Sequence, residues 1–171
     1  MRLIPIDDVT IRDVRDGVLE RTAGFRLGAC ADLVGDVVRQ TAGMLARVPR
    51  EPQFGGYLVV DNGDSVVGTC GFRTGPSAEG EIEIAYFTFP PYEGLGHATQ
   101  MAVELTRIAL ASSSVRRVIA HTLPKRNAST RVLEKVGMRL CGPVEDLEDG
   151  MVWRWQIESA AEQRDAADKR R

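Results

Sequence analysis

Cysteine and histidine are scarce in this chain of 171 residues, which contains three cysteines and two histidines. The cysteines, Cys30, Cys70 and Cys141, lie far apart, are odd in number and form no Cys-x-x-Cys pair. This pattern argues against a disulfide framework and against a Cys/His metal site. We therefore predict that the protein holds no metal and works in a reducing compartment, the cytoplasm.

Long apolar runs and an excess of one charge are missing as well. No run approaches the roughly 18 apolar residues of a membrane-spanning helix, and the N-terminus lacks a basic stretch followed by an apolar one. The formal net charge is only −2, which gives no general affinity for nucleic acids or anionic membranes. We expect neither a nucleic acid nor a membrane as a partner.

The composition that remains is that of an ordinary globular protein, with 43% hydrophobic and 27% charged residues. A chain of this length is expected to form one domain that buries a sizeable core. We place that domain at residues 1–157. Residues 158–171 consist largely of alanine and charged residues, and this composition predicts a frayed helix or a loose tail.

Hydrophobic spacing and turn residues predict a mixed order of helices and strands. A short strand at residues 2–6 precedes a helical stretch at 10–48, which is broken near 24–28. The elements expected after it are strands 57–60, 65–72 and 81–89, a helix at 96–111, a strand at 115–123, a helix at 127–136, and strands 138–143 and 151–157. This order favours an α+β fold with an antiparallel meander and one βαβ-like crossover.

The most informative stretch is the turn at residues 90–99, Pro-Pro-Tyr-Glu-Gly-Leu-Gly-His-Ala-Thr, between a predicted strand and a predicted helix. Gly94 and Gly96 favour a tight backbone turn. Such a turn exposes backbone N–H groups at the positive end of the following helix, where phosphate groups bind. A glycine turn also serves simply to join a strand to a helix, so the turn alone leaves both interpretations open.

Two common nucleotide-binding motifs fit this turn poorly. The Rossmann fingerprint needs a third glycine where Thr99 stands, and an acidic residue at the end of the next strand, which here ends in His-Thr-Leu. A P-loop needs Gly-Lys followed by Ser or Thr, whereas this chain has Gly-His-Ala at that place. A nucleotide-binding oxidoreductase is therefore only a remote alternative.

Residues 86–99 resemble the acetyl-CoA-binding strand, pyrophosphate loop and helix start of the GNAT (GCN5-related) N-acetyltransferases. The family loop reads Gln/Arg-x-x-Gly-x-Gly/Ala, and Glu93, Gly96 and Ala98 stand at its defined positions. A second segment, residues 127–138, reads Asn-Ala-Ser-Thr-Arg-Val-Leu-Glu-Lys-Val-Gly-Met. It is similar to the Asn-x-x-Ser…Leu-Glu-Lys-x-Gly-Phe segment of the subfamily that includes ribosomal-protein N-terminal acetyltransferases.

The resemblance spans residues 57–157, the expected acetyl-CoA-binding core. It implies a GNAT-like α+β fold, in which a mixed, mostly antiparallel central sheet has a splayed strand pair and flanking helices. Residues 10–56 match the family poorly and are expected to form helices on the acceptor side. A homodimer is compatible with the resemblance.

The resemblance also implies how acetyl-CoA is held. Backbone N–H groups of the turn would bind the pyrophosphate, and the pantetheine arm would pair with the preceding strand as an added strand. The residues implied in cofactor binding are Phe87, Thr88, Gly94, Leu95, Gly96, His97, Ala98, Thr99 and Asn127. Glu93 stands where the family usually has Gln or Arg. A carboxylate repels a pyrophosphate unless it turns outward, so the backbone must supply most of the binding.

Acetyl transfer to an amine needs the amine in its neutral form, and a lysine-type amine titrates near ~10.4 and an α-amine near ~8. Glu81 and Glu83 are the candidate bases, because residues two apart on a strand share one face. Two like charges so placed also mark an ordinary solvated face. The equivalent strand of the family often carries a base that acts through water. The resemblance implies Glu83 for this role, because it lies closer to the expected acetyl group, with Glu81 in reserve.

The general acid is harder to assign, because many relatives place a tyrosine where this chain has Leu133. Ser129 is a candidate for protonating or hydrogen-bonding the departing thiolate, although a serine in the first turn of a helix is commonly a partial cap. His121 lies near the end of a predicted strand beside the expected cleft. A histidine there is more commonly a packed or surface residue than a participant in proton transfer.

We therefore expect an acyltransferase, an acetyl-CoA-dependent N-acetyltransferase that moves an acetyl group directly to a primary amine. Protein N-termini and small-molecule amines both remain open as acceptors, since a fold does not fix a substrate. The alternative is a non-catalytic acyl-CoA-binding or regulatory domain on the same fold. Glu93 and the missing tyrosine keep this alternative open.

Overall fold

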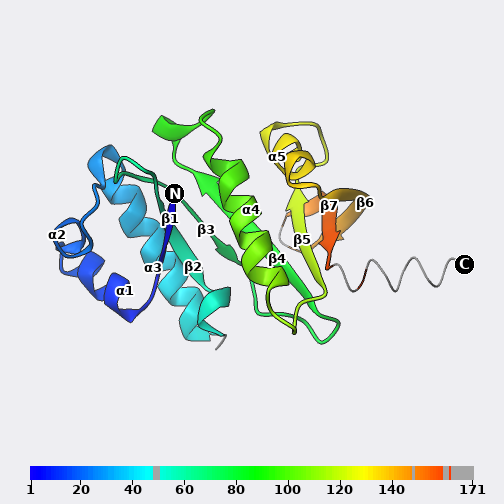
Figure 1. Cartoon of the computed structure of the whole chain (residues 1–171), viewed down its shortest axis with the longest axis horizontal. Helices are drawn as coiled ribbons and strands as arrows, with labels where there is room; N and C mark the ends of the chain where they lie inside the picture. Colours follow the sequence, from blue (N-terminus) through cyan, green and yellow to red (C-terminus); the bar gives the residue numbers. More distant parts are fainter. Residues whose placement is uncertain (48–50, 148, 160–161, 163–171) are drawn as a thin grey trace, which may run out of the picture. The chain divides into compact units, whose positions relative to one another are not determined.

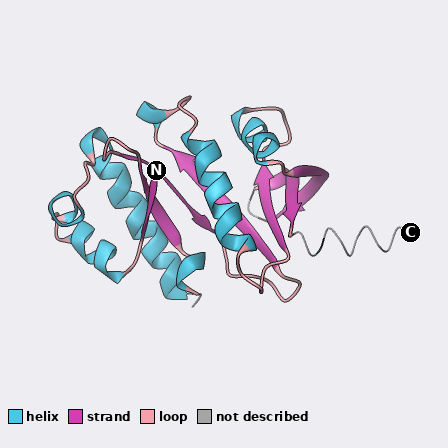
Figure 2. Cartoon of the chain, in the orientation of Figure 1, coloured by secondary structure: helices cyan, strands magenta, loops and turns pink. Residues whose placement is uncertain are grey.

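The computed structural model of the chain describes residues 1–47, 51–147, 149–159 and 162. Its strands and helices are β1 (Arg2–Pro5), α1 (Asp8–Arg15), α2 (Leu19–Ala23), α3 (Ala31–Arg47), β2 (Gly56–Val60), β3 (Val66–Phe72), β4 (Glu81–Thr88), α4 (His97–Leu110), β5 (Arg117–Thr122), α5 (Ala128–Val136), β6 (Arg139–Asp146) and β7 (Gly150–Glu158) (Figure 1). Three short 3-10 turns lie between them, η1 (Gly28–Cys30), η2 (Pro52–Phe54) and η3 (Pro90–Tyr92). Figure 2 distinguishes the helices, strands and loops by colour.

The strands are hydrogen-bonded in the order β1-β2-β3-β4-β5-β7-β6. The pairs β1/β2, β2/β3, β5/β7 and β6/β7 are antiparallel, whereas β4 and β5 are parallel. A parallel pair needs a crossover connection, which α4 supplies. The predicted fold class, a mostly antiparallel sheet with one βαβ crossover and flanking helices, is confirmed.

The parallel ladder between β4 and β5 is short. It joins Glu81–Glu83 to Arg117–Ile119 and then stops. Ile84 and Ala85 continue β4 without a partner in β5. This divergence is the splayed strand pair of the predicted fold.

The chain divides into two compact units. Unit 1 contains residues 1–71 and 86–101, and unit 2 contains residues 72–85 and 102–171. β4 and α4 each have one end in either unit. The single domain that the sequence predicts at residues 1–157 stays a prediction.

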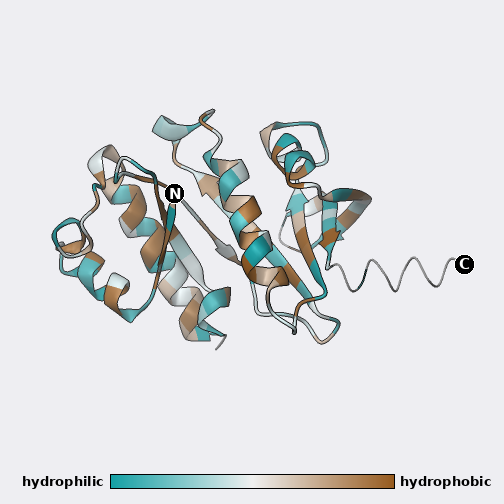
Figure 3. Cartoon of the chain, viewed as in Figure 1, coloured by the Kyte–Doolittle hydropathy of each residue, from teal (hydrophilic) through white to brown (hydrophobic). Residues whose placement is uncertain are grey.

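In unit 1, helix α1 packs against α3. Both helices carry apolar and polar stretches in Figure 3, the pattern of helices that bury one face. Buried apolar side chains from the helices, β2, β3 and the segment after β4 share one core, formed by Ile6, Leu19, Phe25, Cys30, Val34, Val38, Leu58, Val60, Val66 and Phe89. Burial of these side chains stabilises unit 1, and the burial of Phe89 anchors the start of the turn that follows it.

The predicted helical stretch at residues 10–48 is broken twice rather than once. The chain breaks near 24–28, as expected, and also after α1, where Gly17 takes a φ angle of +66°. A residue in this left-handed region ends a helix. At the other end, Asp7 caps α1 by accepting the N–H of Thr10 at 2.9 Å. The last residue of the predicted stretch lies outside the described residues.

In unit 2, the two faces of the strands differ in character. Ile82, Val118 and Trp155 are buried, and Trp155 Nε1 donates a hydrogen bond to Thr122 Oγ1 at 3.1 Å. Trp155 therefore packs in the core of unit 2. Polar side chains that alternate with these residues gather on the opposite face, as the two-residue period of a strand requires; they are Glu81, Glu83, Arg117, His121 and Arg154.

Among the described residues, no helix is long and apolar enough to cross a membrane. Most of the predicted C-terminal tail, residues 160–161 and 163–171, lies outside the described part of the chain.

Candidate functional site

The turn between β4 and α4 has the backbone shape of a phosphate-binding turn. After η3 the chain passes through Gly94 and Gly96, whose φ angles are +78° and +86°. Residues with a side chain avoid this region, so both positions need glycine. No atom lies within 4 Å of where a Cβ would stand on either glycine, so both face open space at the start of α4.

Six consecutive backbone N–H groups, from Gly94 to Thr99, donate no hydrogen bond within the described part of the chain. The first N–H groups of any helix lack partners inside it, and the glycine turn adds further ones before His97. The helix dipole gives this end a partial positive charge. The row of donors has the chemistry that a pyrophosphate requires, so the residues present fit the predicted ligand.

Two buried polar atoms without a partner lie at either side of this turn in the chain. They are Nδ1 of His97 and Oγ1 of Thr88. The ring of His97 meets that of Tyr92 edge-on, with the centroids 6.5 Å apart. Buried polar groups in proteins are normally satisfied, so these two atoms suit a ligand that brings polar groups of its own.

Glu93 and Phe87, the two side chains of special interest near the turn, are both exposed. The N–H of Glu93 closes η3 by bonding to the carbonyl of Pro90 at 3.4 Å. An exposed carboxylate is hydrated and screened, which weakens its repulsion of a nearby anion. The ring of Phe87 meets the ring of Phe89 edge-on, with 5.8 Å between the centroids. The strand before the turn therefore presents one exposed aromatic side chain, Phe87.

Glu81 is held in ion pairs on the polar face of unit 2. Arg117 and Arg154 both donate to its Oε1, each at 2.6 Å. Burial by itself raises the pKa of the Glu81 carboxyl, but the hydrogen bonds and positive charges of the two arginines outweigh it, so this pKa lies below its ordinary value. A carboxylate so stabilised is a poor proton acceptor.

Replacing Glu81 by glutamine is expected to destabilise the fold by about 1–3 kcal/mol at neutral pH, because hydrogen bonds to charged groups are lost. Since the folded-state pKa is lowered, the stability that the carboxylate contributes is present above its ordinary value of 4.5 and is lost as pH falls below it. Urea unfolding of both proteins at pH 7 and at acidic pH measures this. An equal difference at both pH values would contradict it.

Glu83 has a different partner on the same face. Its Oε1 lies 3.0 Å from Nδ1 of His121. Arg73 lies further off, with its Nη1 3.7 Å from the same oxygen and 3.6 Å from Oδ2 of Asp149. Glu83 is therefore paired with a group that can itself accept and release a proton, which distinguishes it from Glu81.

Asn127 and Ser129 lie at the start of α5 in unit 2. The Oδ1 of Asn127 accepts the N–H of Thr130 at 2.9 Å, and the hydroxyl of Thr130 accepts the N–H of Asn127 at 3.0 Å. Thr130, not Ser129, completes this capping box. The cap leaves the side-chain NH2 of Asn127 as its remaining donor, and the side-chain hydroxyl of Ser129 makes no hydrogen bond among the described residues. Leu133, where relatives have a tyrosine, is fully buried.

The structure thus brings together part of the predicted site in each unit. Unit 1 gathers the turn residues and Thr88, while unit 2 contains both glutamates, Asn127 and Ser129. The contact between Glu83 and His121 was missed at the sequence level, where His121 was considered alone. The predicted parallel crossover offered a clue, because it places the two strands side by side.

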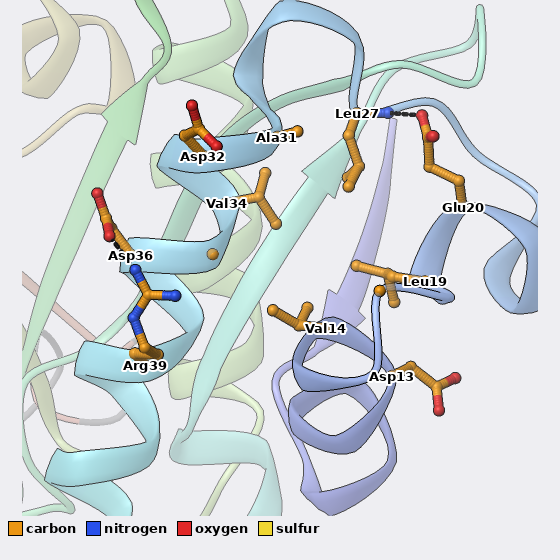
Figure 4. Close-up of a pocket in the computed structure, with 12 residues that line it drawn as sticks. Asp13, Val14, Leu19, Glu20, Leu27, Ala31, Asp32, Val34, Asp36 and Arg39 are labelled. Carbon is orange, nitrogen blue, oxygen red and sulfur yellow. Dashed lines mark hydrogen bonds and ion pairs between the residues drawn. The ribbon is translucent and has the colours of Figure 1, made fainter.

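A cavity of about 540 Å³ lies among α1, α2 and α3 in unit 1 (Figure 4). Val14, Leu19, Leu27 and Val34 contribute apolar surface to it. Acidic side chains also line it, but several are already engaged, since Glu20 accepts the N–H of Leu27, Asp36 pairs with Arg39 and Asp13 contacts Arg12. The cavity lies in the predicted acceptor-side helices, yet it contains none of the predicted site residues.

No group of three or more His, Cys, Asp or Glu side chains in the described ranges is arranged to hold a metal ion. The absence of a metal stays an expectation.

The profile of the acetyltransferase (GNAT) domain family matches residues 32–139. A curated relative, the uncharacterized N-acetyltransferase p20 of Bacillus licheniformis, is 28% identical over 91 residues, which are 53% of this chain and 51% of the relative. The chain therefore matches about half the length of that relative.

Two of the solved structures that share the fold are acetyltransferases in complex with coenzyme A. One is RimL, a ribosomal L7/L12 alpha-N-protein acetyltransferase in complex with coenzyme A, which is 16% identical with a TM-score of 0.64 over 93% of this chain and 94% of that chain. The other is the aminoglycoside acetyltransferase AAC(6')-Ib in complex with coenzyme A, 19% identical with a TM-score of 0.62 over 95% of this chain and 96% of that chain. At these identities the likeness concerns the fold.

Proposed function

This chain belongs to the GNAT acetyltransferase family, and from that membership we propose that it is an acetyl-CoA-dependent N-acetyltransferase acting on a primary amine. The observation that carries the proposal is the row of six backbone N–H groups, from Gly94 to Thr99, that donate no hydrogen bond within the described part of the chain. These groups would bind the pyrophosphate of acetyl-CoA at the positive end of α4.

Other residues of the chain would hold the rest of acetyl-CoA. The backbone near Phe87 and Thr88 would pair with the pantetheine arm, and Asn127 would contact the cofactor with the side-chain NH2 that its cap leaves available. Acetyl-CoA supplies the thioester whose acetyl group is transferred. The exposed position of Glu93 supports a turn that binds mainly through its backbone.

The acceptor amine must lose a proton before it attacks a carbonyl, since amines are largely protonated at neutral pH. We propose Glu83 as the carboxylate that drives this proton removal. Its contact with His121 and the arginine-paired state of Glu81 both support this choice. Ser129 stays a candidate for protonating or hydrogen-bonding the departing thiolate.

The acceptor class is a primary amine, either a protein N-terminus or a small molecule. RimL is named for a protein acceptor and AAC(6')-Ib for aminoglycosides, so the shared fold serves both kinds of amine. A second candidate function is non-catalytic acyl-CoA binding, and the burial of Leu133 favours it, because no tyrosine hydroxyl stands at that place.

Thermal unfolding with added ligand tests the proposal. Acetyl-CoA at about 100 times its dissociation constant is expected to add about 2.7 kcal/mol to the free energy of unfolding, which raises the melting temperature by about 5–10 °C. NAD at the same concentration should leave the melting temperature unchanged. Stabilisation by NAD and none by acetyl-CoA would overturn the assignment.

A further inference from the structure

The two histidines of the chain differ in what their ring nitrogens meet. Nδ1 of His97 is fully buried and unpartnered. Nδ1 of His121 is hydrogen-bonded to Glu83, whereas its Nε2 makes no hydrogen bond within the described part of the chain. The side chain is only 14% exposed. Its Nε2 is nevertheless not fully buried and retains access to solvent.

The contact with Glu83 fixes the state of this ring. A carboxylate accepts only, so the imidazole must donate Nδ1–H to Oε1 of Glu83. The other nitrogen, Nε2, then carries the lone pair and becomes the proton acceptor. Carboxylates that hold a histidine in this way orient the ring and stabilise the imidazolium that forms when Nε2 gains a proton.

Two other charged side chains, Arg154 and Arg73, lie near the pair formed by His121 and Glu83. Arg154 stands opposite His121 in the β5–β7 ladder, but its guanidinium donates to Glu81. Arg73 lies 3.7 Å from Glu83 and 3.6 Å from Asp149, so its positive charge does not act on Glu83 alone. Glu83 is thus the carboxylate in hydrogen-bond contact with the ring of His121.

We infer that His121 is the catalytic residue that takes the proton from the acceptor's ammonium group, and that Glu83 is its positioning residue. An N–H bond of the ammonium breaks and an Nε2–H bond forms, giving a neutral amine and an imidazolium. The imidazolium then releases the proton to water. This inference rests on the proposed function. It assigns the proton removed from the acceptor amine to Nε2 of His121, with Glu83 holding the ring.

The test uses the full chain, acetyl-CoA and a primary amine that the wild-type protein acetylates. His121→Ala is expected to lower kcat/KM by about 10²–10³-fold, to leave acetyl-CoA stabilisation unchanged, and to remove the acid limb of the pH profile. Added imidazole should restore part of the rate in proportion to its neutral form. Glu83→Gln should also slow the reaction, but imidazole should not rescue it, because the ring of His121 is still present.

Retention of at least half the wild-type rate by His121→Ala, or a slow variant with an unchanged pH profile and no imidazole rescue, would overturn the inference and leave Glu83 as the base. If the alanine variant does not fold, His121→Asn, which keeps an N–H donor toward Glu83, takes its place with the same rate and pH-profile criteria. Absence of acetyl transfer by the wild-type protein would instead overturn the proposed function, and the inference with it.

Discussion

Gly96→Val is expected to weaken acetyl-CoA binding by about 100-fold or more. A valine side chain would project into the open space at the start of α4, where Gly96 has no neighbour within 4 Å. It would keep an anion away from the free N–H groups that follow. Each hydrogen bond to a charged group contributes about 1.5–3 kcal/mol, so losing two of them accounts for this factor.

Gly24→Val is the matched control for this change. Gly24 has a φ angle of +70°, also lacks neighbours within 4 Å, and ends α2 in the same unit. Both variants carry the cost of a left-handed residue with a side chain, about 1–2 kcal/mol, so both should melt at similarly lowered temperatures. Isothermal titration with acetyl-CoA separates them. Equal affinity in the two variants would show that the turn does not bind the cofactor.

Glu83→Gln is expected to lower kcat by about 10²–10³-fold while the KM for acetyl-CoA stays within about threefold of wild type. A neutral amide still accepts a hydrogen bond from His121 but no longer places a negative charge beside the ring. The loss should be largest for acceptors with the most basic amines, because these are the most fully protonated. Steady-state rates across a series of amines of graded basicity measure this.

Glu81→Gln provides the comparison, because it makes the same substitution two residues earlier on the same strand face. Its carboxylate is held by Arg117 and Arg154, so we expect lower stability with a rate within about threefold of wild type, measured where the variant is folded. Full rates in both variants would show that neither glutamate acts in catalysis. A slow Glu81 variant beside a fast Glu83 variant would exchange their roles.

Local features of the sequence predicted the fold well. The helix predicted at residues 127–136 is α5, where Asn127 caps the start and Gly137, with a φ angle of +88°, caps the end. The extra break before α2 was missed, because a glycine within a helical pattern is also tolerated in a helix. Gly17 follows α1 with a left-handed φ angle, and Leu19 of α2 is buried in the unit 1 core.

The site was less predictable where it depends on pairs distant in sequence. Glu81 and Glu83 share a strand face and a residue type, and their difference comes from their partners. Arg154 is 73 positions from Glu81, and His121 is 38 positions from Glu83. The register of β4, β5 and β7 sets these contacts, and no short-range pattern encodes that register.

The most direct test of the central claim is the release of free CoA thiol from acetyl-CoA, followed with a thiol reagent across a panel of primary amines and N-terminal peptides. An acetyltransferase should release thiol only with acceptors it accepts, in amounts equal to the acetylated amine found by mass spectrometry. Saturable binding of acetyl-CoA, with thiol release no faster than the acceptor-free background for every amine tested, would contradict that claim and favour the non-catalytic alternative.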